Sequence, residues 1–563
     1  MSISSKSQSK FSASNQPLFL TLWNGVVLIS AFTALFFLFT NGIPFVQWGL
    51  IPEFGGKSVY VNMMRISVSI FFALLGFVYW KYPSIFDQLW VVRCLQSFFQ
   101  VPLWVILPVI SLAYTVILST TCLVRHQNGL SGGDLAVFAQ AVWNTTQGDF
   151  LYSSIKDGIC LLGDHFSPIL VLVTPLYYLW QDPQLLIVFQ VISTAVCIFL
   201  VGLIAKEKLQ SDFIAVIFAL MYFFYYHARV VLHEDFHPEV LAEPFMLLAF
   251  ISLEKKQIFW FLTSLLVVMT GKENMMGISF MLGFYAFAFK KMRWLGFIVM
   301  LCSVGLLFFE LKWAIPHLNF GGRGHDYSGY YEHWYRNLGI KDVGGLFNGA
   351  SPLIYILNIY SPFSFIPFFH LPTLFLTFPI LFQNLLSRNE NMHTFGFHYT
   401  AGIHPFLFIA CIYGFYALVQ KFKWFSDRKI LMACLLFFFM LLRSGPSEYF
   451  YFWNFSKFKV AQDTSVREQI QAIPSQSSVL TQGRTLLQLI NRKNIYILDS
   501  KAFPVGAFAK KHKIDYVILD PTYGAFNKAF IQECLRDLKN YGYSVEFEQD
   551  GFYILRNPVQ SSQ

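Results

Sequence analysis

Long apolar runs separated by short polar segments dominate the chain. About 13 of these runs approach or reach the roughly 20 residues that a helix needs to cross a membrane. They lie at 18–39, 64–80, 102–123, 184–204, 213–226, 240–253, 258–271, 275–289, 294–313, 352–369, 372–386, 401–419 and 429–443. The pattern therefore predicts a mainly α-helical, polytopic transmembrane bundle of about 13 spans.

One further apolar run, 169–180, is not expected to cross. It is short, Pro175 interrupts it, and Gln181, Asp182 and Pro183 end it, which favours a re-entrant or surface helix. With this run left out, the basic clusters between the spans all fall on one side, which the positive-inside rule assigns to the cytoplasm. These clusters are Lys6 and Lys10, Lys81 and Arg93, Lys206 and Lys208, Lys255 and Lys256, Lys290, Lys291 and Arg293, and Lys421, Lys423, Arg428 and Lys429.

The hydropathy pattern divides the chain into three parts. Residues 1–100 are expected to contain an N-terminal tail and two transmembrane helices that precede the core. Residues 101–445 are expected to form the transmembrane core with its outer loops. From 457 to 563 the pattern changes to short strand-like runs and one helical segment, 528–540, which predicts a small α/β domain outside the membrane. This tail lacks a GxGxxG motif and a P-loop, so nucleotide binding is not expected there.

The composition agrees with a membrane protein and argues against a nucleic-acid-binding protein. The 563 residues are 55% hydrophobic and only 13% charged, far below the roughly 25% charged residues of soluble proteins. The net charge of +9 does not indicate nucleic-acid binding, because the basic residues form small clusters between apolar runs. We therefore expect an integral protein of the inner or plasma membrane, with a cytoplasmic N-terminus and an extracytoplasmic C-terminal domain.

The polar stretch 125–168 is the first candidate for a functional site. It contains Asp134, Asp164 and His165, and a carboxylate beside a membrane helix is expensive to desolvate without a partner. Asp134 is the candidate catalytic residue. Apolar residues follow it at helical spacing while Gln140 and Asn144 face elsewhere, so the segment is either a helix along the membrane surface beside a site or simply a solvated loop with an amphipathic segment.

A second outer motif, 227–243, contains His233, Glu234, Asp235, His237 and Glu239 within seven residues. Imidazole and carboxylate groups suit Zn or Mn, and carboxylates suit Mg. The spacing is not that of HExxH, and within the motif Asp235 and His237 are the preferred candidates. These groups could equally bond to one another and to Arg229 at the end of a helix.

Three smaller motifs supply candidate substrate-binding residues: Lys272 and Glu273 at a helix end, Arg323 and His325 in a Gly-rich loop, and His398 and Tyr399 before a span. Lys272 suits a phosphate, and Arg323 with His325 suits a loop that closes over a sugar or phosphate. Each motif is also consistent with ordinary interfacial residues, such as a lysine whose ammonium reaches the membrane surface.

Five segments together resemble a known family. They read GGDLAVFAQAVWNTTQGDF, LGDHFSPILVLVTPLYYL, DFHPEVLAEPFMLLAF, GKEN and FHYTAGIHPFL. From Arg125 to the C-terminus the chain is similar to the predicted membrane proteins called domain of unknown function 2079, which resemble the GT-C superfamily of membrane glycosyltransferases. The resemblance implies a helical fold whose first outer loop carries an acidic base or metal ligand, here Asp134. Leu135 stands where superfamily members often have a second acid.

The resemblance implies an inverting glycosyltransferase at the outer membrane face. Its donor would be a sugar on a polyprenyl phosphate, and its acceptor a hydroxyl or amine of a glycan, lipid or protein. Asp164, His165, Asp235 and His237 would hold a divalent metal (Mg, Mn or Zn), and membrane lipids are further partners. The other class consistent with the residues is a non-enzymatic transporter or a scaffold that binds lipid or glycan.

Overall fold

The structure is a computed structural model that describes most of the chain after residue 100. The described residues are 101–129, 131–319, 350–387, 389–393, 397–444, 464–499, 502–521 and 528–557. The two helices expected within 1–100 lie outside them. So does the predicted boundary between core and tail, because residues 445–463 are not described.

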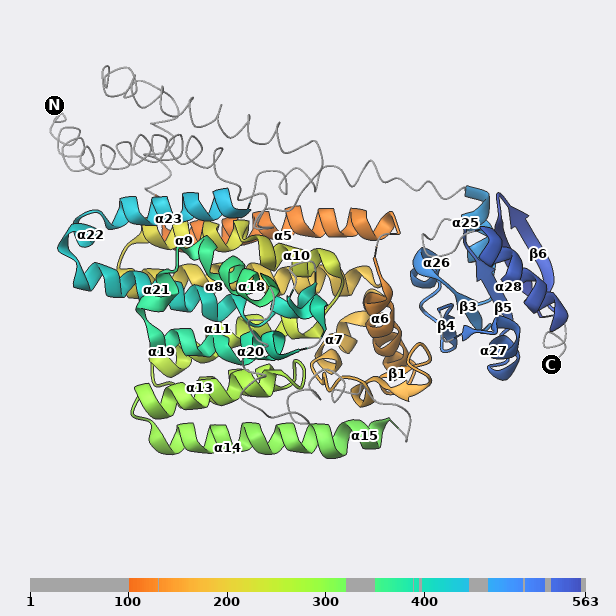
Figure 1. The fold of residues 1–563 in the computed structure, drawn as a ribbon, viewed down its shortest axis with the longest axis horizontal. Helices are drawn as coiled ribbons and strands as arrows, with labels where there is room; N and C mark the ends of the chain where they lie inside the picture. Colours follow the sequence, from red (N-terminus) through yellow and green to blue (C-terminus); the bar gives the residue numbers. More distant parts are fainter. Residues whose placement is uncertain are drawn as a thin grey trace, which may run out of the picture.

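The core is a bundle of helices that lie side by side (Figure 1). Its elements are α5 (Leu103–Gln127), α8 (Gln184–Leu209), α9 (Asp212–Phe224), α10 (Tyr226–Glu234), α11 (Glu243–Glu254), α12 (Ile258–Met269), α13 (Met275–Phe289), α14 (Arg293–Phe309), α15 (Ile315–Leu318), α21 (His404–Lys421), α22 (Lys423–Asp427) and α23 (Lys429–Ser444). A mainly helical core is therefore confirmed.

The number of spans is not confirmed. Among the described residues, four helical stretches are long and apolar enough to cross a membrane by length and composition: Leu103–Gln127, Gln184–Leu209, Asp212–Glu234 and Arg293–Leu318. Within the same residues, four shorter apolar helices, Ile258–Met269, Met275–Phe289, Leu371–Leu386 and Lys429–Leu441, contain 10–17 residues, short of the roughly 20 of a simple span. α7 (Leu170–Tyr177) has only eight residues, which agrees with the expectation that the run 169–180 does not cross.

Proline explains why the first of the two helices expected in 352–386 is cut short. The run 352–369 forms α18 (Ala350–Tyr360), η6 (Ser361–Phe363) and η7 (Ile366–Phe369) instead of one helix. The run 372–386 forms one continuous helical stretch, Leu371–Leu386, built from α19 (Leu371–Leu374), η8 (Phe375–Thr377) and α20 (Phe378–Leu386). Pro362, Pro367, Pro372 and Pro379 each stand in the first turn of one of these pieces. Proline has no N–H and suits the start of a helix, so it divides the region into short segments.

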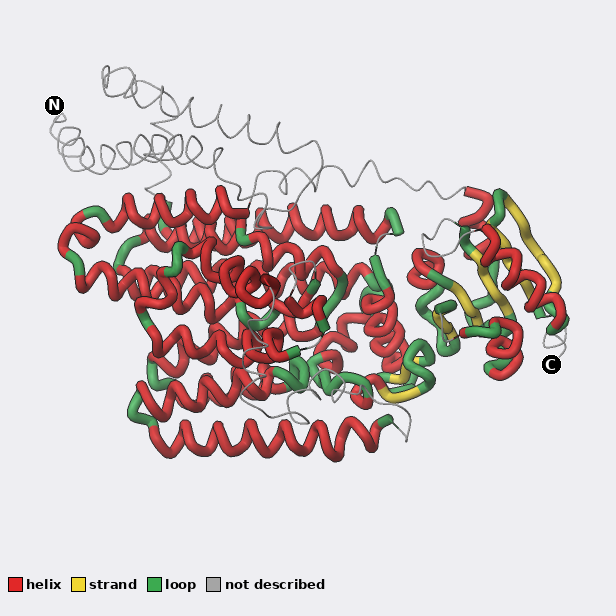
Figure 2. Tube along the Cα trace, viewed as in Figure 1, coloured by secondary structure: helices red, strands yellow, loops and turns green. Residues whose placement is uncertain are grey.

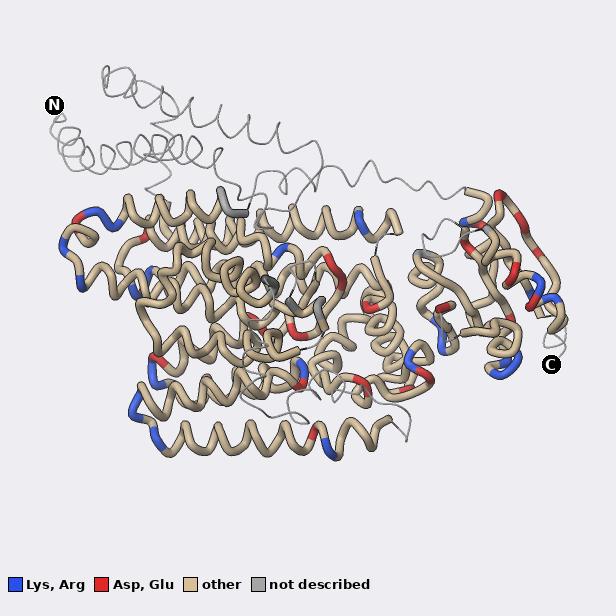
Figure 3. Tube along the Cα trace, in the orientation of Figure 1, with Lys and Arg blue, Asp and Glu red and all other residues tan. Residues whose placement is uncertain are grey.

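The basic turns of the bundle lie together at one end. Lys255 in the α11–α12 turn pairs with Glu207 near the end of α8 at 2.9 Å, and Lys290 after α13 pairs with Glu254 at 2.5 Å. Figure 3 shows many Lys and Arg residues at this end, away from α6 (Gly133–Thr146). Three predicted basic clusters therefore share one end of the bundle, as a common membrane face requires.

The other end carries α6, the short strands β1 (Tyr152–Ser153) and β2 (Ile159–Cys160), the 3-10 turn η2 (Leu161–Gly163), and α7. The sequence leaves this segment either as a helix on a membrane surface or as a solvated loop with an amphipathic segment, and the structure forms a helix packed on most sides. Gln140 and Asn144 are fully buried together with Leu135 to Ala139. The N-terminus of α6, where Asp134 stands, is exposed.

The C-terminal part is a small α/β unit (Figure 2). Its five strands, β3 (Val479–Thr481), β4 (Ile495–Ile497), β5 (Tyr516–Leu519), β6 (Ser544–Gln549) and β7 (Phe552–Arg556), form one sheet in the order β4-β3-β5-β7-β6. β3 is parallel to β4 and β5, whereas β7 is antiparallel to β5 and β6. The helices are α25 (Thr464–Gln471), α26 (Gly483–Gln488), α27 (Val505–Lys511) and α28 (Lys528–Asn540). The short strand-like runs predicted between 457 and 563 are therefore confirmed as strands of one sheet.

Candidate metal and catalytic site

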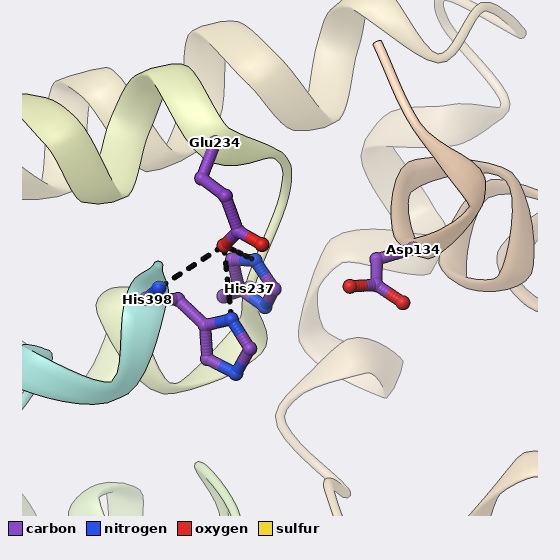
Figure 4. Close-up of side chains that lie close together, drawn as sticks. All are labelled: Asp134, Glu234, His237 and His398. Carbon is purple, nitrogen blue, oxygen red and sulfur yellow. Dashed lines mark hydrogen bonds and ion pairs between the residues drawn. The ribbon is translucent and has the colours of Figure 1, made fainter. Parts of the chain in front are cut away.

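Four side chains that are distant in the sequence converge beside the N-terminus of α6. One ligand atom from each of Asp134, Glu234, His237 and His398 lies within 4.8 Å of the others. Asp134 comes from α6, Glu234 and His237 from the end of α10 and the residues after it, and His398 from η10 (His398–Thr400). Figure 4 shows the Asp134 carboxylate facing the two imidazoles. We call these four residues the acid–histidine cluster.

The Glu234 carboxylate organises the cluster through a single oxygen. Its Oε2 lies 2.7 Å from His237 Nε2 and 2.9 Å from His398 Nδ1, and it accepts the backbone N–H of His398 at 3.1 Å. The two imidazole rings stack with centroids 3.6 Å apart and planes inclined by 19°. One carboxylate oxygen thus contacts both rings. Its hydrogen bond with His398 sets the tautomer and orientation of that ring, whereas its approach to His237 Nε2 is close but not well aligned.

Asp235, the next residue, has a different position because the chain is extended there, with φ −169° and ψ −163°. Its Oδ2 accepts the backbone N–H groups of Gly132 and Leu135, both at 3.0 Å. It therefore caps the first turn of α6, which carries Asp134. A Cβ on Gly132 would stand 3.0 Å from that oxygen, so glycine gives the carboxylate room. Burial raises the pKa of Asp235 to about 6 despite these hydrogen bonds.

A buried ion pair stands next to the cluster. Lys272 Nζ lies 3.5 Å from Glu239 Oε1, and His398 Nε2 lies 4.0 Å from the same oxygen. Burial alone would raise the pKa of Glu239, but the charges of Lys272, His398 and His237 outweigh it and hold the pKa at about 2. Burial would lower the pKa of Lys272, yet Glu239 and Glu273 raise it above its ordinary value. Both groups therefore stay charged at neutral pH.

Glu273, the neighbour of Lys272, connects a third histidine to this region. Its Oε1 lies 3.0 Å from His165 Nδ1, and its Oε2 accepts the backbone N–H of Phe166 at 2.9 Å. Asp164 pairs instead with Lys156 at 2.8 Å. Of the four predicted metal ligands, only His237 therefore belongs to the acid–histidine cluster, whereas Asp164, His165 and Asp235 each contact other groups.

The remaining predicted site residues lie in several places. Tyr399 is half-buried, and its ring packs on His398 with centroids 4.3 Å apart. Gln140 and Asn144 contact backbone and serine groups away from the cluster. Arg323 and His325 lie outside the described residues. The substrate-binding roles of all the residues in this paragraph stay predictions.

Glu234 is the member of the cluster that the sequence does not single out. It is one of several acidic and imidazole groups in the motif 227–243, where the sequence favours Asp235 and His237 instead. Glu234 ends α10 and His237 follows the extended Asp235, so no helical spacing links the two side chains, and the sequence alone does not show that Glu234 rather than Asp235 joins the cluster.

The donor chemistry of the cluster fits a divalent cation. Two carboxylates and two imidazoles form an N/O set typical of Zn or Mn. His237 Nε2 is also buried without a well-aligned hydrogen bond in the described part of the chain, although Glu234 Oε2 is close. A nitrogen in that position can direct a lone pair at a cation.

Comparison with solved structures supports the fold. ArnT from Cupriavidus metallidurans bound to undecaprenyl phosphate superimposes with a TM-score of 0.52 at 12% identity, covering 81% of this chain and 98% of that one. The same protein in the apo state gives a TM-score of 0.46 at 12% identity, with 79% and 98% coverage. At this identity the likeness concerns the fold, and it agrees with the GT-C resemblance of the sequence motifs. No curated protein matches by sequence.

A family model supplies the assignment. It is described as predicted membrane protein (DUF2079), and it matches residues 125–554, which include every member of the acid–histidine cluster and most of the C-terminal unit. The match covers far more than half of the chain, so this integral membrane protein belongs to the DUF2079 family.

Proposed function

We propose that the protein is a membrane glycosyltransferase that moves a sugar from a polyprenyl-phosphate donor to an acceptor hydroxyl or amine. The observation that carries the proposal is the acid–histidine cluster, in which three segments of an ArnT-like fold bring two carboxylates and two imidazoles within 4.8 Å. The ArnT structure contains undecaprenyl phosphate, which supports a lipid phosphate as the leaving group. The acceptor could be a glycan, a lipid or a protein.

Asp134 is the proposed base. It is exposed, so an acceptor can reach it, and it stands in the first turn of α6, where the helix dipole favours its charge. As the acceptor oxygen forms a bond to the anomeric carbon, the bond from that carbon to the phosphate oxygen breaks. The acceptor proton passes to the Asp134 carboxylate, and the polyprenyl phosphate departs with the electron pair. Attack opposite the leaving group inverts the anomeric centre.

The leaving phosphate needs positive charge nearby. Lys272 stands beside the cluster, with a side chain only 12% exposed and an ammonium kept charged by Glu239. Glu234, His237 and His398 would hold a divalent cation, which when bound supplies Lewis-acid stabilisation of phosphate oxygens. The basic turns at the opposite end of the bundle support a position of the cluster at the outer membrane face.

The test uses purified protein in detergent with radiolabelled sugars on undecaprenyl phosphate and a membrane extract as acceptor. Wild-type protein should release undecaprenyl phosphate and transfer label, and Asp134→Asn should lower the rate by about 100-fold or more. Asp427→Asn, an exposed aspartate next to the basic turn before α23, is the matched control and should keep the wild-type rate. Equal rates in wild type and Asp134→Asn would overturn the proposal.

A further inference from the structure

The C-terminal α/β unit contacts the helix that carries Asp134. β4 is an edge strand, since the sheet order leaves it paired only with β3. Edge strands expose unpaired backbone N–H and C=O groups, and proteins usually cover them. The cover of β4 comes from the membrane core: Ser154 Oγ accepts the N–H of Ile495 at 2.9 Å and donates to the C=O of the same residue at 2.6 Å.

Gln140 in α6 extends this contact. The two N–H groups of its amide nitrogen are shared among three acceptors: Ser154 Oγ at 2.7 Å and the backbone C=O groups of Lys493 at 3.0 Å and Arg492 at 3.3 Å. Its amide oxygen accepts from Ser153 Oγ at 3.0 Å and from the Ile155 N–H at 3.3 Å. The side chain is fully buried, so every contact it loses leaves a polar group without water.

The segment that receives these bonds is itself held in place. The Arg492 guanidinium donates to the C=O groups of Leu489, Pro474 and Ser477 at 2.9–3.1 Å. Ile497, at the end of β4, approaches the helix start: its Cδ1 would lie 3.7 Å from a Cβ on Gly133, the residue before Asp134. The exposed ion pair between Lys493 and Asp149 at 2.8 Å adds little.

We propose that the C-terminal unit positions Asp134 by holding α6 through the contact of Gln140 and Ser154 with residues 492–495. The proposal rests on the proposed function, since it deepens the role of the Asp134 site. Gln140 and Ser154 are positioning residues: Gln140 lies six residues, or about 9 Å along the helix, from Asp134. Asp235 fixes the first turn of α6, and the C-terminal unit fixes its middle.

The test compares Ser154→Ala and Gln140→Leu with Ser303→Ala in the full chain. Ser303 is the matched control, because it is buried and its hydroxyl bonds within α14, to the Val299 C=O. Hydrogen–deuterium exchange should become about tenfold faster along α6 in both contact variants and stay unchanged in α8, which shows that the core is folded. The control should exchange like wild type.

Positioning is then separated from simple stabilisation by two further measurements. Zn²⁺ affinity by calorimetry should stay near the wild-type value, because Glu234, His237 and His398 lie outside α6, whereas kcat for sugar transfer should fall about tenfold or more with little change in KM, because a displaced base impairs the chemical step. Faster exchange in α6 with unchanged kcat would overturn the proposal, as would unchanged exchange. If Asp134→Asn keeps full activity, the proposed function fails instead, whatever the exchange of α6 shows.

Discussion

Replacing Glu234 by Gln tests the metal site without changing the shape of the side chain. The contacts of Glu234 with His237 and His398 all use Oε2, at 2.7, 2.9 and 3.1 Å. An amide oxygen in that place would approach a cation without the negative charge of the carboxylate, and it would hold the His398 ring less firmly. Loss of a group that orients ligand imidazoles costs about 10–100-fold in metal affinity.

A loss of this size corresponds to about 1.4–2.7 kcal/mol of binding free energy. The assay is calorimetric titration of Zn²⁺ or Mn²⁺ into protein that has been treated with a chelator. Glu254→Gln is the matched control: Glu254 pairs with Lys290 and Tyr285 among the basic turns and should leave cation affinity unchanged. Wild-type affinity in Glu234→Gln, or no cation binding by the wild type, would refute the reasoning.

Three further predictions concern stability and can be read by thermal unfolding in detergent. Lys272→Met should destabilise the protein by about 3–5 kcal/mol because it leaves the buried Glu239 carboxylate without its lysine, and adding Glu239→Gln should restore most of the loss. Absence of this rescue would contradict the prediction. Asp235→Ala should cost about 1–2 kcal/mol through loss of the α6 cap, and Asp235→Asn, which retains an acceptor oxygen, should cost less. Gly414→Ala should be strongly destabilising because the added Cβ would lie 2.1 Å from a backbone oxygen. In Gly305→Ala the added Cβ meets nothing within 4 Å, so this change should be neutral or stabilising. Similar effects of the two substitutions on the melting temperature would contradict this prediction.

Local patterns predict the helices but not all of their lengths. Apolar runs such as 184–204 and 294–313 form long helices. In an apolar environment a helix satisfies its backbone hydrogen bonds within its own segment, so the local apolar run is enough to predict it. At 372–386 the expected helix forms, whereas at 352–369 the apolar length predicts one long helix that the structure divides, although the prolines are visible in the sequence. The structure shows that the prolines determine where each short helix begins.

Long-range contacts explain what the sequence does not show. Asp134, His237 and His398 each stand out within their own motif, but nothing local indicates that they meet. The choice between Glu234 and Asp235 depends on one extended residue at the end of α10, which directs the two carboxylates to different partners. Gln140 reads as a polar residue facing a site because its partner, Lys493, lies 353 residues later.

The separation of the cluster along the chain also matters during synthesis. Asp134 is made early, but the His398 imidazole is placed in the chain more than 250 residues later. At about 5–20 residues per second, a ribosome needs at least ~13 seconds to add that interval. A growing or prematurely terminated polypeptide that ends before His398 therefore lacks a complete cluster, and we expect it to leave lipid-linked sugars untouched.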